Sequence, residues 1–370
     1  MKFALSLLIF FPLLGHAFEY SGYLKSYPIL QSPAGGYDNR AILQNMGKIQ
    51  IGHDFAFDIH LEASYELIAT TQKHLPHLTP KPSYRVDDLN YYLHDETDPQ
   101  KYKTNLQQNL NRFNLSTTLP FGDLIVGRQI VSFGASKSLA PTDVLTPISI
   151  STIDKEERQG VDAIILRAPI SGLSTVEVGI VAGEDFEKEK SAYYIRPKLY
   201  IDQFDINATF MEFKERKMIG IDLQHPIKDA GFWVEAAYVD SANDRLKNFV
   251  RITTGTDYKF QNSLYLSLEY HYNGSSLGNG FVYPEDYIYV YDYHYFIPTI
   301  SYEFTPLLTG SLQTYINAHD GSIFTTPKIE YNWSDNLYLA LGIYAGLGNE
   351  TTSEFGRYGQ TYYSSLRYYF

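Results

Sequence analysis

The feature that most limits how this chain can fold is an alternation of apolar and polar residues that recurs along most of its length. In residues 57–67 the apolar set is Phe57, Ile59, Leu61, Ala63, Tyr65 and Leu67, and the residues between them are Asp58, His60, Glu62, Ser64 and Glu66. Residues 203–213 and 262–273 alternate in the same way, and no sustained helical period appears. Because successive side chains of a strand point to opposite faces, the pattern predicts strands with one apolar and one polar face.

The alternation divides the chain into eighteen candidate strands, with no linker or change of composition between them. They run over residues 18–27, 41–53, 55–69, 105–119, 121–131, 160–170, 172–182, 191–201, 203–213, 215–226, 230–240, 247–260, 262–273, 294–304, 306–317, 322–333, 336–346 and 360–370. An even number is expected of a single-chain bacterial barrel, and merging one hairpin would leave sixteen. Alternation alone does not separate a barrel from a soluble sandwich with one wet face.

The lengths of the connections separate these two folds. Links after even-numbered strands are short, whereas every long link follows an odd-numbered strand, namely 28–40, 70–104, 132–159, 274–293 and 347–359. Two other odd-numbered links, near 214 and at 318–321, are short. Short turns at one end and long loops at the other are typical of transmembrane barrels. We therefore predict an all-β fold, a transmembrane antiparallel up-and-down β-barrel of 16–18 strands.

The first residues are typical of a secretory signal peptide. Lys2 is followed by an apolar run too short to span a bilayer, and small residues precede the end of the signal at Ala17. We expect residues 1–17 to be removed and residues 18–370 to form one domain. No later apolar run is long enough for a membrane-spanning helix, which excludes a helical membrane protein.

Composition narrows the function classes. The chain has 33 Tyr and 22 Phe, and tyrosine suits the boundary between lipid and water. It has no cysteine, which excludes disulfides, thiol catalysis and cysteine metal sites. A net charge of -12 argues against nucleic acid as a partner. No nucleophile elbow, phosphate-binding glycine loop or metal-ligand spacing appears, so we expect no catalysis, metal or cofactor.

If the apolar parity of each strand faces lipid, the other parity lines a lumen. The predicted lining is acidic at Asp58, Glu62, Glu66, Asp202, Asp205, Asp222, Glu235, Asp257, Glu269, Glu303 and Glu330, and basic at Arg196, Lys198, Arg251, Lys259, Lys328 and Arg367. So many charges require water or partners. The acidic excess predicts a wet lumen with a mild preference for cations. The alternative, in which most charges pair and set no selectivity, stays open.

The chain ends in an alternating strand whose last residue is aromatic. Leu366, Tyr368 and Phe370 share its apolar face. This end resembles the C-terminal signature by which bacterial outer-membrane barrels are recognised for assembly. The resemblance implies that these three residues are an assembly signal and that the barrel assembly machinery is a partner.

The loop at 132–159 and its flanking strands carry a set of spaced residues. The set comprises Gly127, Arg128, Gln129, Phe133, Gly134, Pro141, Thr142, Asp143, Glu157, Arg158, Gly160, Val161, Asp162 and Ala163. It resembles a motif of a family of porin-like outer-membrane barrel proteins from Gram-negative bacteria. Two positions differ, since the family often has Trp where this chain has Phe133 and Asn where it has Ala140. The resemblance implies a barrel that acts as a channel, without a known substrate.

In many porins the third external loop folds inward and narrows the pore, and by count 132–159 is that loop. On this analogy its constriction, or the brace that fixes it, is formed by Arg128, Lys137, Asp143, Glu156, Glu157, Arg158 and Asp162. The same residues could serve only to hold the loop through ion pairs and caps. Both roles stay open, and Arg128 and Gln129 have no predicted facing because their strand alternates poorly.

Together these observations predict passive diffusion of small hydrophilic solutes across the outer membrane of a Gram-negative bacterium. The alternative is a barrel whose lumen is plugged. Such a barrel would be structural, or would bind glycans or adhesion partners at the cell surface, and would act through loops 70–104 and 274–293. The second of these loops carries Tyr283, Tyr287, Tyr289, Tyr291 and Tyr293. Expected partners are outer-membrane lipid, lipopolysaccharide and the solutes, and a homotrimer is left open.

Overall fold

The computed structural model describes residues 18–35, 38–55, 58–72, 84–87, 92–94, 103–240, 248–276 and 290–370. The expected signal peptide, most of loop 70–104, and Tyr283, Tyr287 and Tyr289 lie outside these ranges. Within them the regular structure is almost entirely β-strand, with three short 3₁₀ helices, η1 (Glu184–Phe186), η2 (Lys188–Lys190) and η3 (Phe355–Tyr358). None of the described helices has the length and apolar character needed to cross a bilayer.

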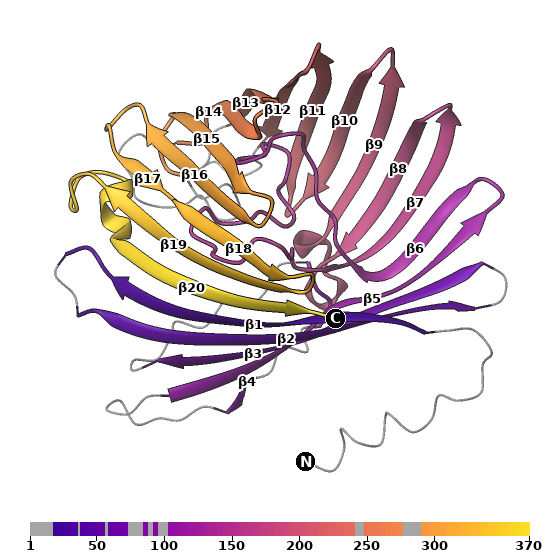
Figure 1. Cartoon of the computed structure of the whole chain (residues 1–370). Helices are drawn as coiled ribbons and strands as arrows, with labels where there is room; N and C mark the ends of the chain where they lie inside the picture. Colours follow the sequence, from indigo (N-terminus) through magenta and orange to yellow (C-terminus); the bar gives the residue numbers. More distant parts are fainter. Residues whose placement is uncertain are drawn as a thin grey trace.

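Eighteen antiparallel strand positions close into one barrel among the described residues (Figure 1). The strands are β1 (Glu19–Ser32), β2 (Arg40–Phe55), β3 (Ile59–Gln72), β4 (Tyr92–His94), β5 (Lys103–Leu119), β6 (Gly122–Gln129), β7 (Val161–Ser171), β8 (Ser174–Ala182), β9 (Ala192–Ile201), β10 (Phe204–Phe213), β11 (Arg216–Ile227), β12 (Ala230–Asp240), β13 (Phe249–Lys259), β14 (Leu264–Asn273), β15 (His294–Thr305), β16 (Leu308–Asn317), β17 (Ile323–Thr325), β18 (Lys328–Ser334), β19 (Leu337–Leu347) and β20 (Gln360–Tyr369). β17 and β18 share one position, and β4 is a short addition paired with β5. β20 pairs with β1 and closes the ring, so the count of eighteen is confirmed and sixteen is excluded.

The two rims of the barrel differ as predicted. At the short-turn rim, neighbouring strands are joined by tight connections such as 172–173 and 202–203. At the long-loop rim the connections include 130–160, 274–293 and 348–359. The predicted long link at 28–40 is wrong, because β1 continues to Ser32 and leaves 33–39 as the connection.

The wall has an apolar outside and a packed inside. On β11, Ile219 and Ile221 are 56% and 51% exposed, whereas Met218 and Asp222 are 1% and 0% exposed. The same alternation places large apolar residues on the outer face of strand after strand. A closed sheet with an apolar exterior leaves no unpaired edge, which is what a wall within lipid requires.

The lumen is occupied by residues 130–160, which join β6 to β7 and are called here the lumen loop. Figure 1 shows this purple segment crossing the interior of the ring. The loop contributes its own apolar residues to the buried core, including Val131, Phe133, Leu139, Val144 and Ile150. The core of this barrel is therefore built around the loop.

Candidate functional site

An ion pair between neighbouring strands closes the base of the lumen loop. Arg128 at the end of β6 pairs with Asp162 at the start of β7, with Nε 2.7 Å from Oδ1 and Nη2 3.0 Å from Oδ2. Gly127 has φ +120, and a Cβ there would lie 2.3 Å from the carbonyl oxygen of Phe113. Gly127 thus interrupts the regular alternation of the strand. This interruption explains why Arg128 and Gln129 are both buried, although successive residues of a regular strand face opposite sides.

A β-bulge in β5 holds the far end of the loop. The β3–β5 register skips Asn111, which re-aims its amide into the lumen. Its Oδ1 accepts a hydrogen bond from the Gly160 N–H at 2.8 Å, and its Nδ2 donates to the Arg158 carbonyl at 3.1 Å. A Cβ on Gly160 would lie 1.9 Å from the Asn111 carbonyl oxygen, so the loop can leave the wall here only through glycine.

Inside the loop, Arg158 pairs with Asp143 and also donates to the carbonyl of Thr146 at 3.0 Å. Asp143 is 3% exposed. Burial raises the pKa of Asp143, and the Arg158 guanidinium acts in the opposite direction. Because a buried carboxylate without its cation is costly, this pair fixes the fold of the loop.

Glu235 of β12 is the main anchor of the loop on the opposite wall. Its Oε2 accepts hydrogen bonds from the Ala135 N–H at 3.0 Å and the Ser136 N–H at 2.9 Å. Its Oε1 accepts from the Thr142 N–H and hydroxyl, both at 2.8 Å. Gly134 lies against this carboxylate with φ +99, where a Cβ would be 2.5 Å from Oε1. One fully buried side chain thus satisfies four donors of the loop.

A second carboxylate, Glu269 of β14, holds the next residue of the loop. Its Oε1 accepts hydrogen bonds from the Lys137 N–H at 2.8 Å and from Trp233 Nε1 at 2.9 Å. The Lys137 ammonium pairs with Asp257 and lies 4.7 Å from the centre of the Trp233 ring. The loop is therefore fixed to three consecutive strands, β12 to β14.

Charged residues at the C-terminal end of the lumen loop form ion pairs with β1, β2 and β20, the strands beside the point where the barrel closes. Lys25 of β1 contacts Asp154 at 2.8 Å and Glu156 at 2.7 Å. Lys48 of β2 contacts Glu157 at 2.5 Å, and Arg367 of β20 also pairs with Glu156. These ion pairs hold the end of the loop against β1, β2 and β20.

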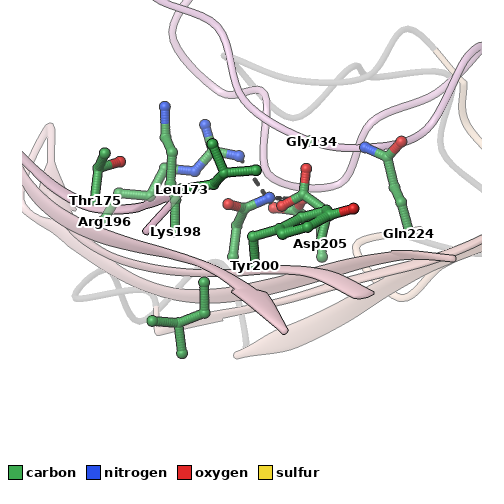
Figure 2. Close-up of a pocket in the computed structure, with 11 residues that line it drawn as sticks. Gly134, Leu173, Thr175, Arg196, Lys198, Tyr200, Asp205 and Gln224 are labelled. Atoms are coloured by element: carbon green, nitrogen blue, oxygen red, sulfur yellow. Dashed lines mark hydrogen bonds and ion pairs between the residues drawn. The ribbon is translucent and has the colours of Figure 1, made fainter. Parts of the chain in front are cut away.

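Two polar cavities flank the lumen loop, so the loop does not fill the barrel. One, of about 430 Å³, lies between Gly134 and the inner wall of β8–β11 (Figure 2). The other, of about 420 Å³, lies between residues 153–156 and the wall of β15–β20. Lys155 faces the second cavity, and burial, followed by the nearby positive charge of Lys328, lowers its pKa to about 8.

Most predicted lumen residues contact a polar partner on the inner wall. These contacts are Glu62–Arg112 at 2.7 Å, Arg196–Asp222 at 3.2 Å, Lys198–Glu177 at 3.1 Å and Lys328–Glu330 at 3.2 Å. Glu66 accepts a hydrogen bond from the Tyr23 hydroxyl at 2.6 Å, Arg251 donates to Asn273 at 3.2 Å, and Asp205 lines the first cavity.

A few predicted lining residues lie elsewhere. Asp58 and Asp202 are exposed in turns of the short-turn rim, with φ +55 and +47, so they do not line the wall. Lys259 and Glu303 pair at 2.8 Å but are exposed at that rim. Asp58 and Asp202 lie outside the strands, and Lys259 and Glu303 lie in the last residues of β13 and β15.

Sequence reasoning missed the lysines of the first two strands. Lys25 and Lys48 are 3% and 6% exposed and pair with the loop. Lys25 shares its inward face with the apolar residues Tyr23, Tyr27 and Ile29. The rule that the apolar parity faces lipid therefore assigns Lys25 to the outside of the barrel, although it lies inside. Asn111 was missed because a bulge leaves no mark in an alternating pattern.

Comparisons with known proteins bear on the fold. No family model matches the sequence, and no curated protein matches it. The solved structure of OccAB4 from Acinetobacter baumannii is similar, with 12% identity, a TM-score of 0.61, and coverage of 95% of this chain and 98% of that chain. The outer membrane protein OprD from Pseudomonas aeruginosa has 11% identity, a TM-score of 0.59, and coverage of 95% and 93%. OpdK with vanillate, from the same organism, has 10% identity, a TM-score of 0.57, and coverage of 95% and 98%.

Proposed function

We propose that this chain is a porin-like channel in the outer membrane of a Gram-negative bacterium, through which small hydrophilic solutes diffuse passively. The observation that carries the proposal is a closed barrel whose lumen is crossed by a pinned loop that leaves polar cavities on both sides. An apolar exterior and a charged interior suit a wall between lipid and an aqueous path. The three solved barrels with the same fold support it by analogy.

We further propose a mild preference for cations. Most inward charges are paired and cancel, whereas Glu235 and Glu269 accept hydrogen bonds from uncharged donors in the described part of the chain. Both carboxylates therefore add unbalanced negative charge where the loop narrows the lumen. Acidic groups at a constriction favour cations.

The test is single-channel recording of the folded mature protein in a planar bilayer under a KCl gradient. Discrete steps with a cation-selective reversal potential support both parts of the proposal, and removing residues 135–155 should raise the conductance. If the protein is shown to be folded by its heat-modifiable gel mobility and yet gives no conductance steps, the proposed channel function is refuted.

The plugged barrel remains the second candidate, because the many bonds between the lumen loop and the wall also suit a plug. Its functional parts would be the external loops, where Tyr291 and Tyr293 are described. The loop deletion separates the two candidates: a plugged barrel conducts only after the deletion, whereas a porin conducts before it.

We propose that the barrel assembly machinery recognises the final strand. Leu366, Tyr368 and Phe370 face outward, each more than two-fifths exposed, as a signal read by another protein requires. Phe370 exchanges backbone hydrogen bonds with Gly22 of β1, at 2.9 Å and 3.1 Å. Recognition of this strand would therefore precede closure of the barrel. Replacing Phe370 with Ser should reduce insertion, measured as heat-modifiable protein in the outer membrane.

A further inference from the structure

The cavity beside Gly134 has the features of a built binding site. It lies between the lumen loop and the inner wall near the short-turn rim, where β8 to β11 begin or end. Figure 2 shows Lys198 and Arg196 on one side, Gln224 on the other, and Gly134 on the loop above them. A volume of about 430 Å³ is within the range of small-molecule sites, which is roughly 300–1,000 Å³.

Two buried polar atoms at this cavity have no hydrogen-bond partner among the described residues. They are Arg196 Nε, a donor, and Asn207 Oδ1, an acceptor. Both side chains are more than nine-tenths buried, at 7% and 5% exposed, and both bind the carboxylate of Asp222. A buried polar group left unpaired is costly. A ligand that accepts a hydrogen bond from Arg196 Nε and donates one to Asn207 Oδ1 would remove this cost at both atoms.

The lumen loop holds the arginine in position. The Arg196 guanidinium lies 5.1 Å from the centre of the Phe133 ring, which in turn packs edge-on against Tyr194. Asp222 also contacts the guanidinium, with Oδ2 3.2 Å from Nη2. A donor held by both an aromatic ring and a carboxylate loses little freedom on binding, so the site is preorganised.

The charges around the cavity cancel, which favours a neutral ligand. Asp222 pairs with Arg196, Glu177 is shared between Lys198 and Arg167, and Asp205 has no cationic partner among the described residues, so three acidic groups balance three basic ones. A hydroxyl group matches the unpaired atoms, since it accepts from Nε–H and donates to Oδ1. Tyr200 at the edge of the cavity is 47% exposed and offers a ring face for stacking.

We propose that this cavity is a subsite for a neutral polyhydroxylated solute of about monosaccharide size, bound after it passes the lumen loop. The proposal rests on the proposed channel function and names the class of solute that the channel would take. Arg196 and Asn207 bind a hydroxyl group, and the neighbouring Gln224 and Thr175 provide further polar contacts.

The test is calorimetric titration of the detergent-folded full chain with D-glucose, with D-gluconate and D-glucosamine as an anion and a cation of the same size. Glucose should bind in the millimolar range, and more tightly than either ion. Replacing Asn207 with Ala should weaken glucose binding about fivefold, as expected for one hydrogen bond. Tighter binding of either ion would overturn the proposal.

Asn109→Ala is the matched control. Asn109 is also buried and inward, at 7% exposed, but its Oδ1 accepts from Arg85 and it lies outside the cavity. This variant should bind glucose like the parent, and equal loss in both variants would overturn the assignment of the site. Calorimetry needs no open pore, so glucose binding without conductance would reject the channel alone, whereas conductance without glucose binding would reject the subsite alone.

Discussion

Replacing Glu235 with Gln should loosen the lumen loop without changing the shape of its anchor. The carboxylate accepts four hydrogen bonds, two at each oxygen. The amide keeps one acceptor and turns an N–H₂ group toward two N–H or O–H donors of the loop. Loss of two hydrogen bonds to a charged group corresponds to about 3 kcal/mol at the lower end of the usual range. That free energy shifts the ratio of released to anchored loop about 100-fold.

The assay is single-channel recording in symmetrical KCl, where a released loop appears as flicker into levels of higher conductance. Glu62→Gln is the matched control, because it also removes one inward negative charge. Glu62 bonds to Gln50, Arg112 and Asn114 on the wall, and none of its described bonds reaches the lumen loop. If the two variants give the same traces, the anchoring role of Glu235 is refuted and only the charge matters.

Three further predictions follow from the loops. Lys155, whose pKa is lowered to about 8 by burial and then by Lys328, loses its charge as pH rises from 7 to 9. The reversal potential should therefore shift toward cation selectivity over that interval in the parent and stay flat in Lys155→Gln. Gly134→Ala places a Cβ against Glu235 at φ +99, and should lower the unfolding free energy by about 1–3 kcal/mol and increase the flicker; unchanged traces would contradict this. Burial, and to a lesser extent Asp320, raises the pKa of Glu354 from 4.5 to about 7, so the protonated form is favoured in the fold and stability falls as pH rises from 4.5 through 7. Glu354→Gln should therefore gain up to about 3 kcal/mol relative to the parent between pH 4.5 and pH 8, measured by the midpoint of heat-modifiable gel mobility, and a difference that does not vary with pH would count against it.

The strands could be predicted from the sequence because a barrel wall repeats one local rule, apolar outside and polar inside. The rule fails where local chemistry is ambiguous. The first candidate strand ended at residue 27, yet β1 continues through Pro28 and pairs with β2 along its length. The β1–β20 register omits Tyr27 and Pro28, which is consistent with proline having no N–H to donate. In the same way Pro327 separates β17 from β18 within one strand position.

The residues of the lumen loop could be picked out from the sequence, but their partners could not. Lys25 and Asp154 are 129 positions apart, and Ala135 and Glu235 are 100 apart. Such contacts depend on how the barrel closes and where the loop descends, and no local pattern encodes either. The sequence left open whether the lining charges pair, because the partner of each charge lies on a neighbouring strand and depends on register.

Glu156 of the lumen loop reaches the first and the last strand at once, since Lys25 belongs to β1 and Arg367 to β20. The Glu156 carboxylate therefore links the two strands whose pairing closes the barrel. Neither cation is in place until the two ends of the polypeptide have met. The lumen loop therefore reaches its final position only in a closed wall, and a barrel whose first and last strands stayed apart would also leave this end of the loop unanchored.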